Sequence, residues 1–227
     1  MKISMPYRVD SRQWHKMTGD TMRSLPLLIF VMAWMAQAHS EQACVPVEKG
    51  WALEARAESG PLCADVLLQS PAKQEGDNEG TRRLRVFEAG KPGFESDEAA
   101  LCKTCGGAMG DPFQGIEWQG QTLAVSNYGG SRESWKETWK IAKREGRWVI
   151  AGWDRKSFDR MTLDAWGESV DTLNGKATAS FEPGAESKKK PRKLSCPHKS
   201  RTPGVDQIGA LREKEPFACG LKVDWAN

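Results

Sequence analysis

The stretch WKETWKIAKREGRWVIAGW, from Trp135 to Trp153, decides the fold class of this chain. In its first half, large apolar side chains alternate with polar ones at a period of two, which is typical of a strand with one buried and one wet face. Turn residues at Arg144–Arg147 separate this half from a second apolar run. The stretch therefore predicts a long antiparallel hairpin. Its buried face would carry Trp135, Glu137, Trp139 and Ile141, and its wet face Lys136, Thr138 and Lys140.

Other parts of the chain show the same preference for strands. Asn174-Gly175 favours a type I′ turn between two strands, because both residues accept a positive φ. No segment has a sustained helical period, although 97–101 and 205–215 could each form a short helix. We expect a mainly β domain built of antiparallel hairpins, either a single sheet or a sandwich-like domain. The predicted strands cover residues 64–69, 83–88, 116–118, 122–128, 169–173, 176–181 and 219–225.

Residues 1–38 predict a signal peptide. Arg23 is followed by an apolar run of about a dozen residues, which is too short to span a bilayer. Ala36-x-Ala38 then matches the small residues of a cleavage site. The head of this segment is long, and Met17 and Met22 are alternative starts. We expect a soluble protein in the periplasm or outside the cell, with no membrane span after cleavage.

The charge of the mature chain limits its possible partners, and its cysteine content predicts disulfides. The predicted signal removes five Lys or Arg and two Asp or Glu, which leaves 28 basic and 28 acidic residues. This balance gives no electrostatic reason to expect nucleic acid as a partner. All six cysteines lie in the mature part, and an even number in an exported chain favours disulfides. They are Cys44, Cys63, Cys102, Cys105, Cys196 and Cys219.

Composition divides the mature chain into three parts. Residues 39–182 form the predicted β domain. Residues 183–203 contain a run of basic residues and several prolines, which predict a basic flexible linker. Residues 204–227 are expected to pack back on the domain. A disulfide between Cys196 and Cys219 would hold the far end of the linker there.

The loop LCKTCGGAMGDPF, Leu101 to Phe113, is the most unusual motif of the chain. A thioredoxin-type centre needs its first cysteine at a helix N-terminus, where the thiolate is stabilised. The residues after Cys105 oppose such a helix, since each interior glycine costs about 1 kcal/mol and a proline about 3 kcal/mol. We therefore expect Cys102 and Cys105 to form a disulfide or thiol loop with a structural role.

Zinc is the alternative for this loop, because Cys-x-x-Cys-Gly-Gly has the form of a zinc knuckle. A tetrahedral site needs four ligands, and the best set in the chain is Cys102, Cys105, Cys196 and His198. An oxidising compartment favours the disulfide over the metal. We expect no cofactor, with zinc as the second hypothesis.

The tryptophans of the central hairpin suggest another binding site. Trp135, Trp139, Trp148 and Trp153 could stack on an extended glycan. Tryptophan at a period of two nevertheless belongs more often to a core. The sequence has no G-x-S-x-G, H-E-x-x-H or P-loop motif, and its acid pairs are typical of a solvated surface. We therefore predict no enzymatic activity.

A longer combination of motifs runs from the CxxC loop into a following glycine turn, through Cys102, Cys105, Gly106, Gly107, Gly110, Asp111, Pro112, Phe113, Tyr128, Gly129, Gly130 and Ser131. This combination resembles a family of uncharacterised exported bacterial proteins with a CxxCGGxxGDPF … YGGS core, over roughly Leu84 to Leu173. The strand expected at 64–68 also resembles FG-GAP repeats, but residues 57–63 lack most acids of their calcium loop. The resemblance implies an exported β domain and supplies no reaction.

These features together predict an exported, soluble, non-enzymatic binding or protein-interaction module with a structural CxxC loop. Its partner would be a protein or a glycan of the cell envelope. The alternatives are a glycan-binding module that uses the tryptophan-rich hairpin and a zinc-binding or thiol–disulfide protein that uses the CxxC.

Overall fold

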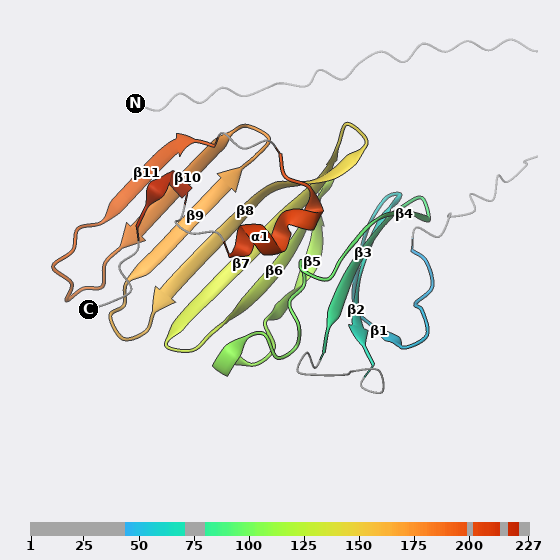
Figure 1. Cartoon of the computed structure of the whole chain (residues 1–227), viewed down its shortest axis with the longest axis horizontal. Coiled ribbons are helices and arrows are strands. Elements are labelled where there is room, and N and C mark those ends of the chain that lie inside the picture. The colour runs from blue at the N-terminus through green and yellow to red at the C-terminus, as the bar shows by residue number, and fades with distance from the viewer. Residues whose placement is uncertain (1–43, 71–79, 199–201, 214–217, 223–227) are drawn as a thin grey trace, which may run out of the picture. The chain divides into compact units, whose positions relative to one another are not determined.

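A computed structural model describes residues 44–70, 80–198, 202–213 and 218–222 (Figure 1). Within them, a four-stranded sheet has the order β1-β2-β3-β4, and a seven-stranded sheet has the order β11-β10-β9-β8-β7-β6-β5. All strand pairs are antiparallel. The predicted mainly β, hairpin-built fold is confirmed, and it consists of two sheets. The predicted signal peptide lies outside the described residues.

The strands of each sheet follow one another in chain order. The first sheet contains β1 (Trp51–Ser59), β2 (Leu62–Gln69), β3 (Arg82–Glu88) and β4 (Lys91–Ser96). The second contains β5 (Phe113–Gln119), β6 (Thr122–Gly130), β7 (Glu133–Arg144), β8 (Arg147–Asp159), β9 (Ala165–Asp171), β10 (Lys176–Glu182) and β11 (Arg192–Pro197). The helical elements are the 3₁₀ turns η2 (Gly107–Met109), η3 (Val205–Gln207) and η4 (Ala218–Gly220) and the helix α1 (Ile208–Arg212).

The β7–β8 hairpin forms as the sequence predicts. Trp139 pairs with Trp153, and the register runs to Arg144 opposite Arg147. The two turn residues between them, Glu145 and Gly146, have φ angles of 50° and 78°. Positive φ at both central residues is the requirement of a type I′ turn, whose twist matches that of the strands.

The β9–β10 hairpin is present, but its predicted type I′ turn is wrong. The last pair is Asp171 with Lys176, so the loop has four residues, and only Gly175 in it has a positive φ, of 61°. The Asp171 carboxylate accepts hydrogen bonds from the backbone N–H groups of Leu173 and Asn174 at 3.0 and 2.9 Å. This side chain closes the longer loop and removes the need for positive φ at Asn174.

The two edge strands of the four-stranded sheet were not predicted. Most side chains of β1 are exposed or half-buried, and β4 contains a proline and a glycine. Edge strands bury few side chains and tolerate proline, so neither has the alternation of apolar and polar residues that marks a strand in a sequence.

Three further predictions need correction. Residues 97–100 form a bend, because the Ser96 hydroxyl accepts the backbone N–H groups of Glu98 and Ala99. The supposed flexible linker contains β11, which is hydrogen-bonded to β10 over residues 192–197. The closing strand expected at 219–225 begins instead as η4, and residues 223–225 lie outside the described residues. The predicted short helix at 205–215 is present as η3 and α1.

The core lies against one face of the seven-stranded sheet. Its main cluster combines Val66 and Val86 of the small sheet with Val125 and Trp139 of the large one. The C-terminal segment completes it: Ile208 of α1 is fully buried, and Ile150 in β8 donates its backbone N–H to the Pro203 carbonyl at 2.9 Å. Figure 1 shows α1 beside β7 and β8.

Candidate functional site

The opposite face of the large sheet carries a row of short polar side chains, one from each successive strand. Ser126 pairs with Thr138, Thr138 with Asp154, and Asp154 with Ser169. Residues directly opposite on adjacent strands share one face, so this register places their side chains together. We call this row the hydroxyl rung, and it comprises Ser126, Thr138, Asp154, Ser169, Thr178 and Ser195.

The neighbouring rung on the same face is basic. Lys136 in β7 lies directly opposite Lys156 in β8, and both side chains are exposed. Like charges at directly paired positions destabilise a sheet. Lys140, on the same face of β7, forms an ion pair with Asp154, whose carboxylate lies 2.6 Å from its ammonium group. Lys136 and Lys156 make no ion pair with any residue that the structure describes.

Two shallow hollows lie over these rungs. One has a volume of about 560 Å³ and lies over β5 to β8, and the other has a volume of about 450 Å³ and reaches β10. Both are lined by Lys136, Thr138 and Asp154, so they adjoin and form one depression, which we call the polar trough. Six strands at about 4.8 Å spacing make it about 24 Å long. It is long enough for an extended ligand.

Gly167 lines the trough, although the packing around it does not require a glycine. Its φ is not positive, and the nearest atom to an added Cβ would be the Ser180 hydroxyl at 3.3 Å. Gly152 differs, because a Cβ there would lie 2.3 Å from the Val170 carbonyl oxygen. A glycine inside a strand weakens it, and often marks a place where a ligand approaches the backbone.

The CxxC loop and the YGGS turn, distant in sequence, lie against each other. Gly130 donates its backbone N–H to the Gly106 carbonyl at 2.9 Å, and Tyr128 donates to the Pro112 carbonyl at 2.7 Å. A Cβ on Gly129 would lie 3.0 Å from the Gly106 Cα. The glycines of the two motifs therefore permit backbone contact, which is a structural role.

The rest of the predicted motif loop is also held by contacts. Asp111 pairs with the fully buried Arg82 at 2.6 Å, and the guanidinium of Arg82 lies 5.1 Å from the Phe113 ring centroid. Gly107 and Gly110 have φ angles of 63° and 79°, which only glycine adopts readily. The turn after Tyr128 closes when Ser131 donates its backbone N–H to the Glu133 carbonyl at 3.0 Å.

All six cysteines form disulfides, which confirms the predicted disulfide bonds. The pairs are Cys44–Cys63, Cys102–Cys105 and Cys196–Cys219. This pairing corrects the zinc hypothesis. Cys102 and Cys105 lie in the loop against β6, whereas Cys196 lies in β11 with four strands between, and the His198 ring packs edge-on against Trp153 at 5.6 Å. The four proposed zinc ligands are not brought together.

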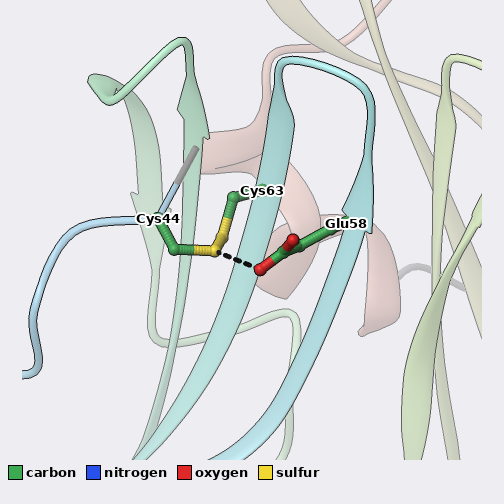
Figure 2. Close-up of side chains that lie close together, drawn as sticks. All are labelled: Cys44, Glu58 and Cys63. Carbon is green, nitrogen blue, oxygen red and sulfur yellow. Dashed lines mark hydrogen bonds between the residues drawn. A yellow bond between two sulfur atoms is a disulfide. The ribbon is translucent and has the colours of Figure 1, made fainter. Parts of the chain in front are cut away.

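The Cys44–Cys63 disulfide lies beside the Glu58 carboxylate of the small sheet (Figure 2). A Glu58 carboxylate oxygen is 3.3 Å from the Cys44 sulfur. Among the described residues, Cys44, Glu58 and Cys63 are the one group of possible ligand atoms close enough together to hold a metal ion. The two cysteines are joined in a disulfide, however, and offer no thiolate. The bridge ties the chain before β1 to β2.

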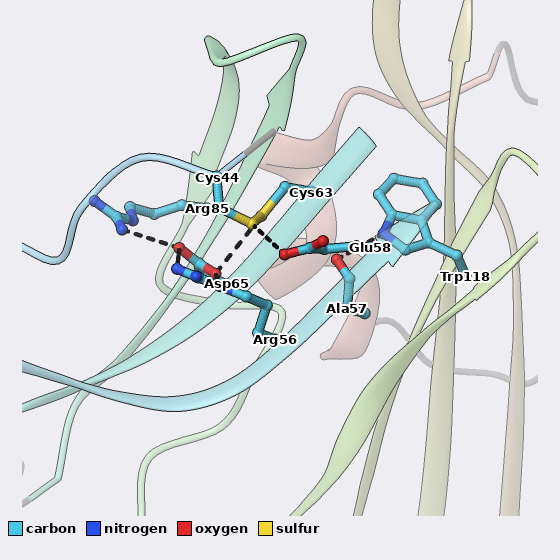
Figure 3. Close-up of a disulfide and its surroundings, with 8 residues drawn as sticks. All are labelled: Cys44, Arg56, Ala57, Glu58, Cys63, Asp65, Arg85 and Trp118. Carbon is cyan, nitrogen blue, oxygen red and sulfur yellow. Dashed lines mark hydrogen bonds and ion pairs between the residues drawn. A yellow bond between two sulfur atoms is a disulfide. The ribbon is translucent and has the colours of Figure 1, made fainter. Parts of the chain in front are cut away.

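Asp65, next to this disulfide, is fully buried and held by two arginines (Figure 3). Arg56 and Arg85 approach its carboxylate at 2.7 and 3.1 Å. Nearby, the Trp118 indole N–H of β5 donates to the Ala57 carbonyl of β1 at 3.1 Å, which links the two sheets. The contacts of this cluster are those of a structural support, because its charges are paired with one another.

The predicted tryptophan platform is corrected by burial. Trp139 and Trp153 are 0% and 5% exposed, so neither can stack on a sugar. Trp148 is half-buried against Phe94 and Trp118, with ring centroids at 5.5 and 6.3 Å. Trp135 is also half-buried, on the face turned toward the core. The period-two pattern of β7 therefore reflects tryptophans that face the core. The polar trough lies on the opposite face of the sheet.

The sequence contained one indication of the trough. Lys136, Thr138 and Lys140 were correctly placed on the wet face of β7. Their partners on β8 to β11 were missed as site residues, because single serines, threonines and lysines are common on any solvated strand.

Asp159, the last residue of β8, closes the β8–β9 turn. Its carboxylate accepts hydrogen bonds from Arg132 at 3.0 Å and from the backbone N–H groups of Met161 and Thr162 at 2.7 and 3.2 Å. Arg132, and then these N–H groups, hold the pKa of Asp159 below its ordinary value.

Substitution Arg132→Ala is expected to raise the pKa of Asp159 toward its ordinary value, without reaching it because the backbone donors remain. Carbon-detected NMR titration of the carboxyl groups measures this. Because the pKa is lower in the folded chain, the stabilisation by ionised Asp159 is present above the ordinary pKa and is lost as pH falls through the lowered one. The two proteins should therefore converge in stability at low pH. Asp171, whose pKa is lowered chiefly by the Asn174 side chain, is the internal control and should not shift.

No helix in the described part of the chain is long and apolar enough to cross a membrane. In comparisons with known proteins, no family model, no curated protein and no solved structure matches this chain.

Proposed function

We propose that this chain is a non-enzymatic binding module whose polar trough takes an elongated, acidic glycan. The observation that carries the proposal is the Lys136–Lys156 pair. These two ammonium groups lie directly opposite each other, exposed and without an acidic partner among the described residues. A bound anion would offset their repulsion, which otherwise weakens the sheet.

The hydroxyl rung supports a glycan as the ligand. Serine and threonine hydroxyls both donate and accept hydrogen bonds, which suits a ligand rich in hydroxyl and carboxylate groups. Single-stranded nucleic acids are instead bound on stacking aromatic side chains, which line neither hollow. The trough is open at the surface and crosses six strands, so it fits a chain better than a compact small molecule.

Export of the protein is part of the proposal. Three disulfides are typical of an oxidising compartment, and the signal peptide expected at residues 1–38 would deliver the protein there. An acidic polysaccharide of the cell envelope would then be the natural ligand class.

The double substitution Lys136→Gln/Lys156→Gln is expected to weaken binding of polygalacturonate, titrated calorimetrically at low salt. Exposed charge pairs contribute about 0.2–1 kcal/mol each, so the loss should be about two- to thirty-fold. Neutral dextran has no charge for the two lysines to bind, so the substitution should not change its binding. Lys49→Gln/Lys91→Gln removes the same charge outside the trough and is the matched control. Equal affinity of the two double variants, or no binding of polygalacturonate by the parent, would contradict the proposal.

Substitution Gly167→Val tests the trough separately from charge. The Ser180 hydroxyl can rotate away, so the added side chain should leave the thermal midpoint unchanged or raise it, since valine is favoured in strands. The same side chain would fill the depression and weaken binding of polygalacturonate. Gly167→Val with undiminished binding would show that the ligand lies elsewhere.

A further inference from the structure

The three disulfides differ in their access to solvent. Cys44 and Cys63 are 3% and 0% exposed. Cys196 and Cys219 are half-buried and pack against the core clusters. In the CxxC loop, Cys102 is half-buried but Cys105 is exposed. The Cys102–Cys105 bridge is therefore the one most open to an incoming thiol.

This bridge also contributes least to stability by cross-linking. It joins residues only three apart, whereas the other two span 19 and 23 positions. In the chain-entropy model, the stabilisation that a disulfide provides rises with the length of the loop that it closes, so this small ring stabilises the domain least. Breaking the small ring is consequently the least costly reduction for the folded domain.

The loop is held in place without the sulfur–sulfur bond. Lys103 and Cys105 donate their backbone N–H groups to the Gly80 and Cys102 carbonyls, both at 3.0 Å. Arg82 donates to the Leu101 carbonyl at 2.7 Å, and Gly106 accepts from Gly130. These bonds fix the backbone on both sides of the cysteines. The two sulfurs would therefore stay within reach of each other after reduction and could be rejoined.

We propose that Cys102–Cys105 is a thiol–disulfide exchange site, which a dithiol protein partner reduces while the domain stays folded. A thiolate of the partner attacks the Cys105 sulfur, a partner–Cys105 disulfide forms, and the Cys102–Cys105 bond breaks. The electron pair goes to the Cys102 sulfur, 3.6 Å from the Thr104 hydroxyl, which can donate a hydrogen bond to it. That thiolate then takes a proton from water.

The second thiolate of the partner completes the transfer. It attacks the partner's own sulfur in the mixed disulfide, forms the partner's disulfide and releases the Cys105 thiolate, which is protonated. Two electrons pass to this chain, and the partner is oxidised by two. The chain is the substrate in this exchange, because its loop lacks the helix that would activate Cys102 as a catalyst. The site is independent of the polar trough.

The test uses the purified protein with dithiothreitol as the probe. Increasing amounts are added without denaturant, free thiols are blocked with N-ethylmaleimide, and the blocked positions are mapped by peptide mass. We expect Cys102 and Cys105 to be blocked first, with the near-ultraviolet circular dichroism unchanged. In a second portion that is left unblocked and then oxidised, the original mass should return. Earlier reduction of either other disulfide, or loss of the tertiary signal together with the first reduction, would overturn the proposal.

Single-cysteine variants test which sulfur is attacked. Cys102→Ser leaves a free Cys105, and Cys105→Ser leaves a free Cys102, with the other two bridges intact. The free Cys105 should react with glutathione disulfide several times faster than the free Cys102. An equal or reversed order would contradict the assignment of Cys105 as the point of attack.

Discussion

Replacing Trp139 by alanine is expected to lower the free energy of unfolding by about 3–5 kcal/mol. The side chain is fully buried at the centre of the large sheet, where its ring lies 5.9 Å from that of Trp153. It is held between β6 and β8, whose hydrogen-bonded backbones cannot close on the void. Domains of this kind have total stabilities of about 5–15 kcal/mol, so the loss is a large fraction. Urea unfolding followed by far-ultraviolet circular dichroism measures it.

Substitution Trp139→Phe is the matched control. The Trp139 indole N–H is buried and has no hydrogen-bond partner among the described residues, which costs about 1–3 kcal/mol. Phenylalanine removes this donor and leaves a smaller void, so it should cost much less than alanine. If both substitutions cost the same, packing around the ring is not what makes Trp139 important.

Replacing Arg212 by alanine is expected to cost about 3 kcal/mol, the second largest effect. Arg212 in α1 reaches Glu137 of β7 at 2.7 Å and donates to the Glu98 carbonyl at 2.6 Å. The Glu137 side chain is only 5% exposed, so the substitution leaves a buried carboxylate that still accepts a hydrogen bond from the Asn127 amide but has lost its arginine partner. The same substitution should loosen the C-terminal segment. Hydrogen exchange at Ile208 would report this directly.

Arg132→Ala is the control for this prediction. Arg132 also contacts a carboxylate through two nitrogens, but its side chain is 61% exposed. Water and salt screen such a pair, so its loss should have a much smaller effect on urea unfolding. Equal losses of unfolding free energy for Arg132→Ala and Arg212→Ala would contradict the expectation that burial makes the Arg212–Glu137 pair the more important one. Because the Arg212 guanidinium lies 5.8 Å from the Trp139 ring centroid, substitutions at 139 and 212 should not be additive.

The strands in the middle of the sheets could be predicted because each carries its own evidence. In β7, alternating apolar and polar residues indicate both the strand and its inner face, and the burial pattern agrees. The edge strands β1 and β4 could not be predicted in this way, because few of their side chains are buried. Likewise, β11 was hidden in a basic segment: only Leu194 and Cys196 mark its inner face.

The candidate site could be predicted only in part. The wet face of β7 was recognisable from Lys136, Thr138 and Lys140. The trough needed the register of six strands, and register between strands is a long-range property that local sequence does not contain. The same limit applies to the tryptophans, where the pattern indicates a common face but does not say what covers it.

The sequence by itself determined the fold class, the faces of the central strands and the preference for disulfides, because residue periodicity and cysteine number act locally or through composition. Only the tertiary structure decided which cysteines pair, that the CxxC loop lies against the YGGS turn, and that Lys136 faces Lys156. Each of these joins residues far apart in the chain, and their contacts depend on the simultaneous packing and register of several strands.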